Sequence, residues 1–171
     1  MFGRSLFPSV SLVLAIGFFA VPSLHAQSAV AVDGGVTTLG DGYESISVFE
    51  TGVRFGSLRR KRVNADVRLA TAPQALTLGA LVLAADIDAA YVLPLGKGID
   101  ATPRAGFSMV AAVSSGGAGA VPGINYGVGI VARLTAPLAI RFDYSHRIFM
   151  APGDGESIGA SSFLIGIAVL H

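Results

Sequence analysis

The segment 125–147, NYGVGIVARLTAPLAIRFDYSHR, constrains the fold of this chain more than any other stretch. Two runs of alternating residues flank a break at 135–137, and in the second run Ile140 and Phe142 alternate with Arg141 and Asp143. Side chains of a strand point alternately to its two faces, so each run predicts a β-strand with one aliphatic and one charged or small face. A nearly continuous aliphatic face opposite charges set among glycines is typical of a barrel wall with lipid outside and a polar interior.

The same alternation recurs along the rest of the chain and predicts eight strands. These are residues 29–38, 43–56, 62–71, 76–93, 99–113, 125–134, 138–147 and 160–171. Short turns are expected at 57–61, 94–98 and 135–137 on the side of both termini, and loops at 39–43, 72–77, 114–123 and 150–159 on the other side. The fold class expected is all-β, an eight-stranded antiparallel up-and-down transmembrane β-barrel with a polar, salt-bridged interior.

Two stretches leave the strand boundaries open. Residues 76–93 keep one parity without any turn residue, although a spanning strand needs only about 9–11 residues. A second interpretation omits 29–38 as the first strand and splits 75–93 at Ala84-Ala85. It also gives eight strands but needs a turn where turn chemistry is lacking, so we favour the first.

Nearly every charge outside the turns falls on the parity opposite the aliphatic residues. Besides Asp33, the interior charge network is expected to comprise Glu50, Arg54, Arg62, Asp66, Arg68, Asp86, Asp88, Asp100, Arg104, Arg133, Arg141, Asp143 and Arg147. At eight strands the lumen is only wide enough for side chains to fill it, and buried ions need partners. We therefore expect a structural salt-bridge network, with a selectivity lining for a pore as the alternative.

Composition supports an exported membrane barrel. Hydrophobic residues make up 52% of the chain and charged residues only 13%, against about 25% in soluble domains. After the first 26 residues no uninterrupted apolar run reaches the length of a membrane helix. Cysteine is absent, which excludes disulfides and thiolate metal sites. The net charge of +1 argues against a nucleic-acid partner.

The N-terminal residues have the features of a targeting signal. Arg4 precedes the short apolar run 12–21, and Leu24-His25-Ala26 offers a small-residue cleavage site, so residues 1–26 are predicted to be a signal peptide. Residues 27–171 would then form a single barrel domain in the outer membrane, as a monomer surrounded by lipid.

The hairpin and the final strand SSFLIGIAVL resemble the eight-stranded outer-membrane β-barrel domain family, the OmpA/OmpX-like group. The resemblance rests on the run GVGI-x-x-RLTAPLAIRFDYSHR and covers about residues 99–171. It implies insertion by the barrel-assembly machinery. One departure is His171, which stands where many members of that family carry a terminal aromatic residue.

Catalytic and cofactor-binding residues are not expected. Ser145 and His146 are adjacent and therefore point to opposite faces of a strand, so they cannot act as nucleophile and base. His146 is expected outward, beside Tyr144, near the rim. No phosphate loop, dinucleotide fingerprint or HExxH zinc motif occurs, so no cofactor and no metal is expected.

Three functions remain compatible with these patterns. The first, which we favour, is a non-enzymatic outer-membrane barrel that stabilises the envelope or presents surface loops. The second is a narrow pore or a conduit for lipid or small solutes. The third is a secreted, soluble, lipocalin-like barrel, which would need the aliphatic face inside.

Overall fold

The computed structural model describes residues 28–40, 45–150 and 157–171. The strands are β1 (Ser28–Gly40), β2 (Ser45–Ser57), β3 (Val63–Thr71), β4 (Ala80–Tyr91), β5 (Leu93–Gly96), β6 (Ile99–Ser114), β7 (Gly117–Arg133), β8 (Leu138–Met150) and β9 (Ser157–Leu170). A short helix, α2 (Gln74–Thr77), lies between β3 and β4. The predicted signal peptide, residues 1–26, lies outside the described residues.

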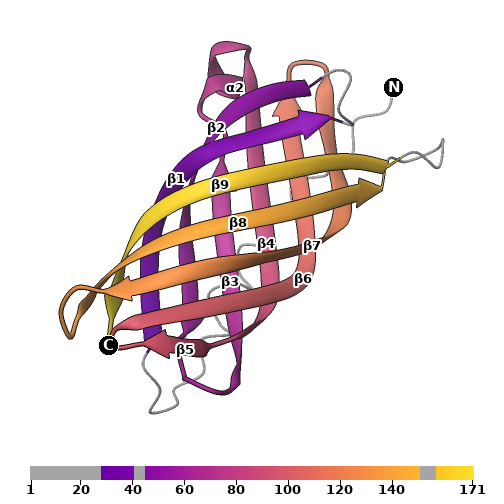
Figure 1. The fold of residues 1–171 in the computed structure, drawn as a ribbon. Helices are drawn as coiled ribbons and strands as arrows, with labels where there is room; N and C mark the ends of the chain where they lie inside the picture. Colours follow the sequence, from indigo (N-terminus) through magenta and orange to yellow (C-terminus); the bar gives the residue numbers. More distant parts are fainter. Residues whose placement is uncertain (1–27, 41–44, 151–156) are drawn as a thin grey trace.

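The strands form one antiparallel sheet that closes on itself (Figure 1). Its order is β4-β3-β2-β1-β9-β8-β7-β6-β5, and a further pairing of β4 with β6 completes the circle. Only Val92 separates β4 from β5, and both pair with β6, so the two share one of eight positions in the wall. The predicted eight-stranded antiparallel barrel is thus confirmed.

The two uncertain stretches of the sequence are resolved. Residues 29–38 lie within β1, which pairs with β2 on one side and with β9 on the other. β4 runs unbroken through Ala84 and Ala85, both paired with β3 and β6. The second interpretation, with a turn at Ala84-Ala85, is therefore wrong.

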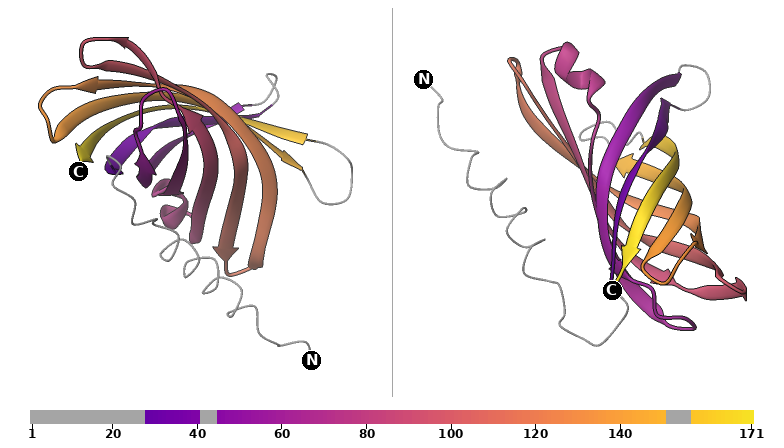
Figure 2. Two further views of the ribbon diagram at one scale, coloured as in Figure 1. Left: turned by 90° about the horizontal axis from the view of Figure 1, so that it is seen from below. Right: turned by 90° about the vertical axis from the view of Figure 1, so that its left-hand side faces the viewer.

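The two ends of the barrel differ in character (Figure 2). At one end, which we call the short-turn end, lie the connections 58–62, 97–98 and 134–137. The start of β1 and the end of β9 lie there too, with Ala29 paired to Leu170. At the other, the long-hairpin end, α2 and the β6–β7 hairpin project beyond the wall.

The loop predicted at 114–123 is wrong. β6 and β7 stay paired out to Ser114 and Gly117, so most of that stretch extends the hairpin. Its glycine, alanine and serine content is typical of loops, but small side chains also permit close, regular pairing, and Gly117 takes the left-handed turn conformation (φ 137°). Of the predicted loop 150–159, residues 151–156 lie outside the described part.

Side chains sort strictly by parity. The outer wall carries an apolar belt: Val32, Val36, Phe49, Val53, Phe55, Ile87, Phe107, Val128, Phe142, Phe163, Ile165 and Ile167, all exposed. Tyr144 and Phe163 add a ring pair across β8 and β9, with centroids 4.9 Å apart. Acidic and basic side chains of the described strands turn inward instead. No helix among the described residues is long and apolar enough to cross a membrane.

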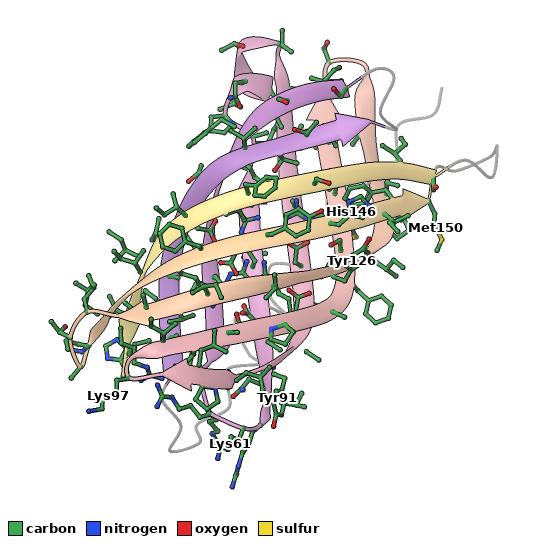
Figure 3. All side chains as sticks on the ribbon, viewed as in Figure 1. Lys61, Tyr91, Lys97, Tyr126, His146 and Met150 are labelled. Carbon is green, nitrogen blue, oxygen red and sulfur yellow. The ribbon has the colours of Figure 1, made fainter. Side chains whose placement is uncertain are left out.

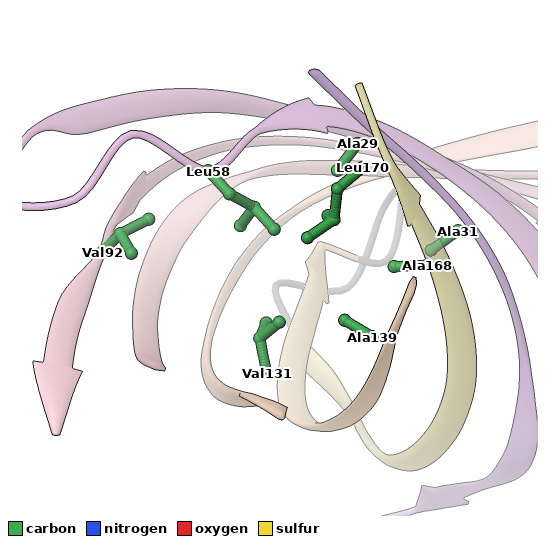
Figure 4. Packing of buried hydrophobic residues seen from close by; sticks show 8 residues of the cluster. All are labelled: Ala29, Ala31, Leu58, Val92, Val131, Ala139, Ala168 and Leu170. Carbon is green, nitrogen blue, oxygen red and sulfur yellow. The ribbon is translucent and has the colours of Figure 1, made fainter. Parts of the chain in front are cut away.

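A cluster of buried apolar residues lies inside the barrel at the short-turn end (Figure 4). Leu58, from the turn between β2 and β3, lies buried with Val92, Val131 and Leu170 and with small alanines of β1, β8 and β9. This apolar plug closes the lumen below the charged residues. It is the part of the interior that most resembles a conventional hydrophobic core.

Glycines let the neighbouring strands approach closely inside this narrow barrel. A Cβ on Gly106 would stand 2.0 Å from the carbonyl oxygen of Ile87 and 2.6 Å from Oδ1 of Asp88. At Gly119, in the projecting hairpin, a Cβ would meet no atom within 4 Å. The first glycine is required by the wall, whereas the second is not.

We therefore expect Gly106→Ala to destabilise the folded barrel by about 1–3 kcal/mol, since the strand must shift away from Ile87. Gly119→Ala should change stability by less than about 1 kcal/mol, and in the stabilising direction if at all. Urea denaturation of the detergent-folded variants measures both. Equal stability of the two variants would contradict the close approach.

Candidate functional site

The candidate site is the barrel interior, where the strands place their charges. Six described acids and five arginines form one connected set of ion pairs: Asp33, Glu50, Asp66, Asp86, Asp88 and Asp143 with Arg54, Arg68, Arg104, Arg141 and Arg147. All eleven are buried. Each acid contacts two arginines, so the charges compensate one another across the lumen.

The half of the network nearer the long-hairpin end is built around Arg147 and Arg68. Arg147 donates from Nη2 to Oδ2 of Asp86 at 2.7 Å and from Nη1 to Oε2 of Glu50 at 3.1 Å. Arg68 donates from Nη2 to Oδ1 of Asp33 at 2.6 Å and from Nη1 to Glu50. Such forked contacts between a guanidinium and carboxylates are the strong class of charged hydrogen bond.

The half nearer the short-turn end joins β2, β3, β4, β6 and β8. Arg141 donates from Nε to Oδ2 of Asp143 at 2.7 Å and from Nη2 to Oδ2 of Asp66 at 3.1 Å. Arg54 lies 3.3 Å from Asp66, and Arg104 of β6 reaches Asp143 of β8 across the intervening strand β7. Hydrogen bonding within the described protein is less complete here: Nη1 of Arg54 and Oδ1 of Asp66 lie within ion-pair distance, but neither they nor Nε of Arg54 form a hydrogen bond with a described residue.

A separate trio lies close to the short-turn end. Asp100, which is fully buried, pairs with Arg60, whose Nε lies 2.8 Å from Oδ1, and accepts a hydrogen bond at Oδ2 from Nε of Arg133 at 3.2 Å. The expected network member Arg133 is therefore only partly enclosed. Arg60 lies in the turn expected at 57–61 and, although its side chain is 41% exposed, it supplies a contact to this buried carboxylate.

Arg62 differs from its expected position. Sequence parity placed it on the inner face of a strand from residue 62, but β3 begins at Val63 and Arg62 is exposed in the preceding turn. The backbone leaves the strand geometry there because Lys61 adopts a left-handed conformation (φ 57°). The alternation of inward and outward side chains therefore no longer predicts where the side chain of Arg62 points.

Neutral polar side chains complete the network, and sequence reasoning did not name them as members. Thr37 donates to Oε2 of Glu50 at 2.6 Å and lies 2.8 Å from the hydroxyl of Ser162. Ser108 donates to Oδ1 of Asp86 at 2.5 Å and accepts from Asn125 at 2.9 Å. All four have the inward parity, which is the signal that could have identified them.

A small cavity opens above the network toward the long-hairpin end. It has a volume of about 80 Å³, with walls from apolar residues such as Val48, Val82 and Phe149 and a floor formed by Glu50 and Arg147. Below the floor the ion pairs fill the lumen, and the apolar plug follows. Along its axis the interior is thus successively apolar, charged and apolar.

The outer wall carries one polar pair that invites a catalytic interpretation. Nδ1 of His146 lies 2.9 Å from the hydroxyl of Ser161, and the ring of Tyr126 lies 5.4 Å from the histidine ring. Ser145 points inward and is buried, on the face opposite His146. Within the described residues every carboxylate is buried in the lumen, so none there can orient His146 as a triad requires.

Metal ligation has no candidate in the described part of the chain. No group of three or more His, Cys, Asp or Glu side chains there is arranged to hold an ion. The carboxylates of the lumen instead face arginines, which occupy the positions a cation would take.

Comparisons with solved structures agree with this architecture. The attachment invasion locus protein Ail of Yersinia pestis superposes with a TM-score of 0.59 at 11% identity, over 86% of this chain and 100% of that one. Neisserial surface protein A gives 0.60 at 14% identity, over 83% and 96%. The N-terminal β-barrel domain of Pseudomonas aeruginosa OprF gives 0.60 at 13% identity, over 86% and 100%. No protein-family model and no curated protein sequence matches the chain.

At these identities the likeness is one of fold. The chain has the fold of the small eight-stranded outer-membrane barrels, as its sequence pattern indicated. The polar, salt-bridged interior that we expected is present as well.

The network predicts a sharp contrast between two arginines. Arg147→Met should destabilise the folded barrel by about 3–5 kcal/mol, because Glu50 and Asp86 lose a shared guanidinium while remaining buried. Arg62→Met, the matched control on an exposed arginine, should change stability by no more than about 0.5 kcal/mol. Denaturant titration in detergent gives both values, and a mild effect at Arg147 would contradict a structural role for the network.

Proposed function

We propose that this chain is a non-enzymatic outer-membrane β-barrel that spans the bilayer with a closed interior and presents its long hairpins on one side. The observation that carries this proposal is the apolar belt around a lumen of compensated charges. Soluble monomers rarely expose contiguous apolar patches beyond a few hundred Å². A lipid surrounding suits the apolar belt, and closing the sheet lets the strands hydrogen-bond to one another around the whole wall.

The distribution of side chains argues against a soluble ligand-binding barrel. A lipocalin-like protein would need its aliphatic face inside, whereas Phe107 and Phe163 are about 70% exposed and Arg68 is 1% exposed. The structure therefore has the inside and outside of a membrane barrel. The third function considered from the sequence is excluded on this ground.

The filled lumen favours a structural or presenting role over a pore. Ions would have to cross two connected layers of arginine–carboxylate pairs and then the apolar plug formed by Leu58, Val92 and Val131. Opening such a path would leave buried charges without partners, at several kcal/mol each. Ion conduction through the lumen is therefore the second candidate function, and it is tested below.

The long-hairpin end supports a role in presentation. Leu76, in α2, is 59% exposed, and Leu78, just after it, is 85% exposed; Ile46 and Met150 are exposed near the neighbouring strand ends. The β6–β7 hairpin exposes both of its faces beyond Ala112 and carries no charge from Ala105 to Ala132. This rim offers small and apolar surface to a partner or to the envelope.

Export and orientation follow from the same proposal. The signal peptide predicted in residues 1–26 would direct the chain across the inner membrane, and the barrel-assembly machinery would insert it. Because both ends of the described sheet lie at the short-turn end, we assign that end to the periplasm and the long hairpins to the outside.

Membrane insertion can be tested by gel mobility. The detergent-folded protein should migrate differently unboiled and boiled, since a closed barrel resists unfolding by detergent alone. Phe142→Arg, in the belt, should reduce insertion into vesicles because an arginine facing lipid costs about 2–4 kcal/mol near the bilayer centre. Ser115→Arg, in the projecting hairpin, should insert like the parent chain. Equal mobility of the boiled and unboiled parent would overturn the proposal.

Conduction can be tested separately. In planar bilayers the inserted protein should show no steady ion current, because the network and the apolar plug close the lumen. Insertion is verified by the mobility shift. Reproducible conductance steps from the inserted protein would contradict the closed barrel and support a pore.

A further inference from the structure

The cations outside the lumen gather at one end of the barrel. In the described part of the chain, every lysine or arginine that lies outside the interior network and its trio is in the connection 58–62 or the connection 97–98. We call Arg59, Arg60, Lys61 and Arg62 the basic turn. Lys97 lies at the same end, as Figure 3 shows for Lys61 and Lys97.

This positive charge is not neutralised locally. The turn segments 57–62, 92–98 and 134–137 contain no carboxylate side chain. The nearby Asp100 is fully buried and already held by Arg60 and Arg133. Arg59, Lys61, Arg62 and Lys97 form no ion pair with a described residue, so within the described part of the chain four cations at the short-turn end have no acidic partner.

The backbone of the basic turn is held in place. Asn64 accepts from the backbone N–H of Arg59 at 3.0 Å and donates to the carbonyls of Arg59 and Arg62 at 3.0 and 2.8 Å. The N–H of Lys61 donates to the carbonyl of Val92 at 2.8 Å. A fixed turn presents its cations together, so a ligand need not order the chain first.

Apolar surface adjoins the basic turn directly. Val63, the first residue of β3, is 70% exposed, and Leu95 is 63% exposed. Tyr91 and Leu93, on the β4–β5 segment that joins the basic turn through the Arg60–Val92 bridge, are exposed as well. Cations and aliphatic side chains therefore share one edge of the wall, where the apolar belt ends.

We propose that the short-turn end binds the phosphate headgroups of anionic glycerophospholipids in the leaflet that borders it. This inference rests on the proposed membrane insertion and adds a lipid preference to it. The phosphates would contact Arg59, Lys61 and Arg62, while the acyl chains lie on Val63 and Leu95. A soluble polyanion would use the cations alone and leave the adjoining apolar edge uncovered, which is why we favour lipid.

The test compares spin-labelled phosphatidylglycerol with spin-labelled phosphatidylcholine at the protein boundary, in phosphatidylcholine vesicles holding the full barrel. At low salt we expect the anionic lipid to associate at least about threefold more strongly, and 1 M NaCl should remove most of the difference. The triple variant Arg59→Gln/Lys61→Gln/Arg62→Gln should bring the ratio to about one. It leaves Arg60 and its contact with Asp100 intact.

The matched control is Arg59→Lys/Arg62→Lys, which keeps the charge and should keep the preference. Insertion of every variant is checked by the mobility shift. A parent barrel that inserts but shows equal association of both lipids overturns the lipid preference alone, whereas failure to insert overturns the membrane assignment. Tight binding of soluble polyglutamate by the detergent-folded parent, without any preference for phosphatidylglycerol in vesicles, would also overturn the proposal and indicate an acidic polymer as the partner.

Discussion

Closure of the sheet at eight strands is the constraint on which the rest of this structure depends. A barrel of that size leaves room in its lumen for side chains only, so whatever faces inward must pack and find partners among the other inward residues. The chain meets this requirement with arginines and carboxylates of nearly equal number. Glycines such as Gly106 and Gly129 make the space, since a Cβ on Gly129 would stand 2.5 Å from the hydroxyl of Thr102. The belt outside and the network inside are thus two results of the same alternation.

Alternation made most of this architecture predictable. A strand of period two fixes which residues share a face, and the parity of the charged residues in the sequence indicates which face lines the lumen. The ion-pair partners within the lumen cannot be predicted in the same way, because which side chains meet across a closed barrel depends on how the register of its strands is staggered. Arg147 reaches Glu50, which is 97 positions away in the sequence. Nothing in the sequence around either residue indicates that two side chains so far apart in the chain form an ion pair.

The errors of sequence reasoning fall where the backbone leaves strand geometry or where composition misleads. Arg62 lies in the turn before β3 and not on its inner face, because the left-handed Lys61 interrupts the strand geometry there. The stretch 114–123 was expected to be a loop from its small residues, yet backbone pairing alone holds it as a hairpin. Turn geometry and the pairing of strand ends depend on tertiary contacts, which neither the hydrophobic period nor the composition of the sequence predicts.

The long reach of the interior contacts has a consequence for how the barrel assembles. Thr37 and Ser162, on strands near opposite ends of the chain, meet only once β1 and β9 have paired, and Arg147 joins Glu50 and Asp86 only when the wall between them is in place. A half-closed sheet would therefore hold carboxylates and guanidinium groups without their partners at its open edge. Desolvation of the unpaired charges raises the free energy of such intermediates. Pairing of β1 with β9 and neutralisation of the interior charges therefore occur as one cooperative event. The network thereby favours complete barrels over partly joined ones.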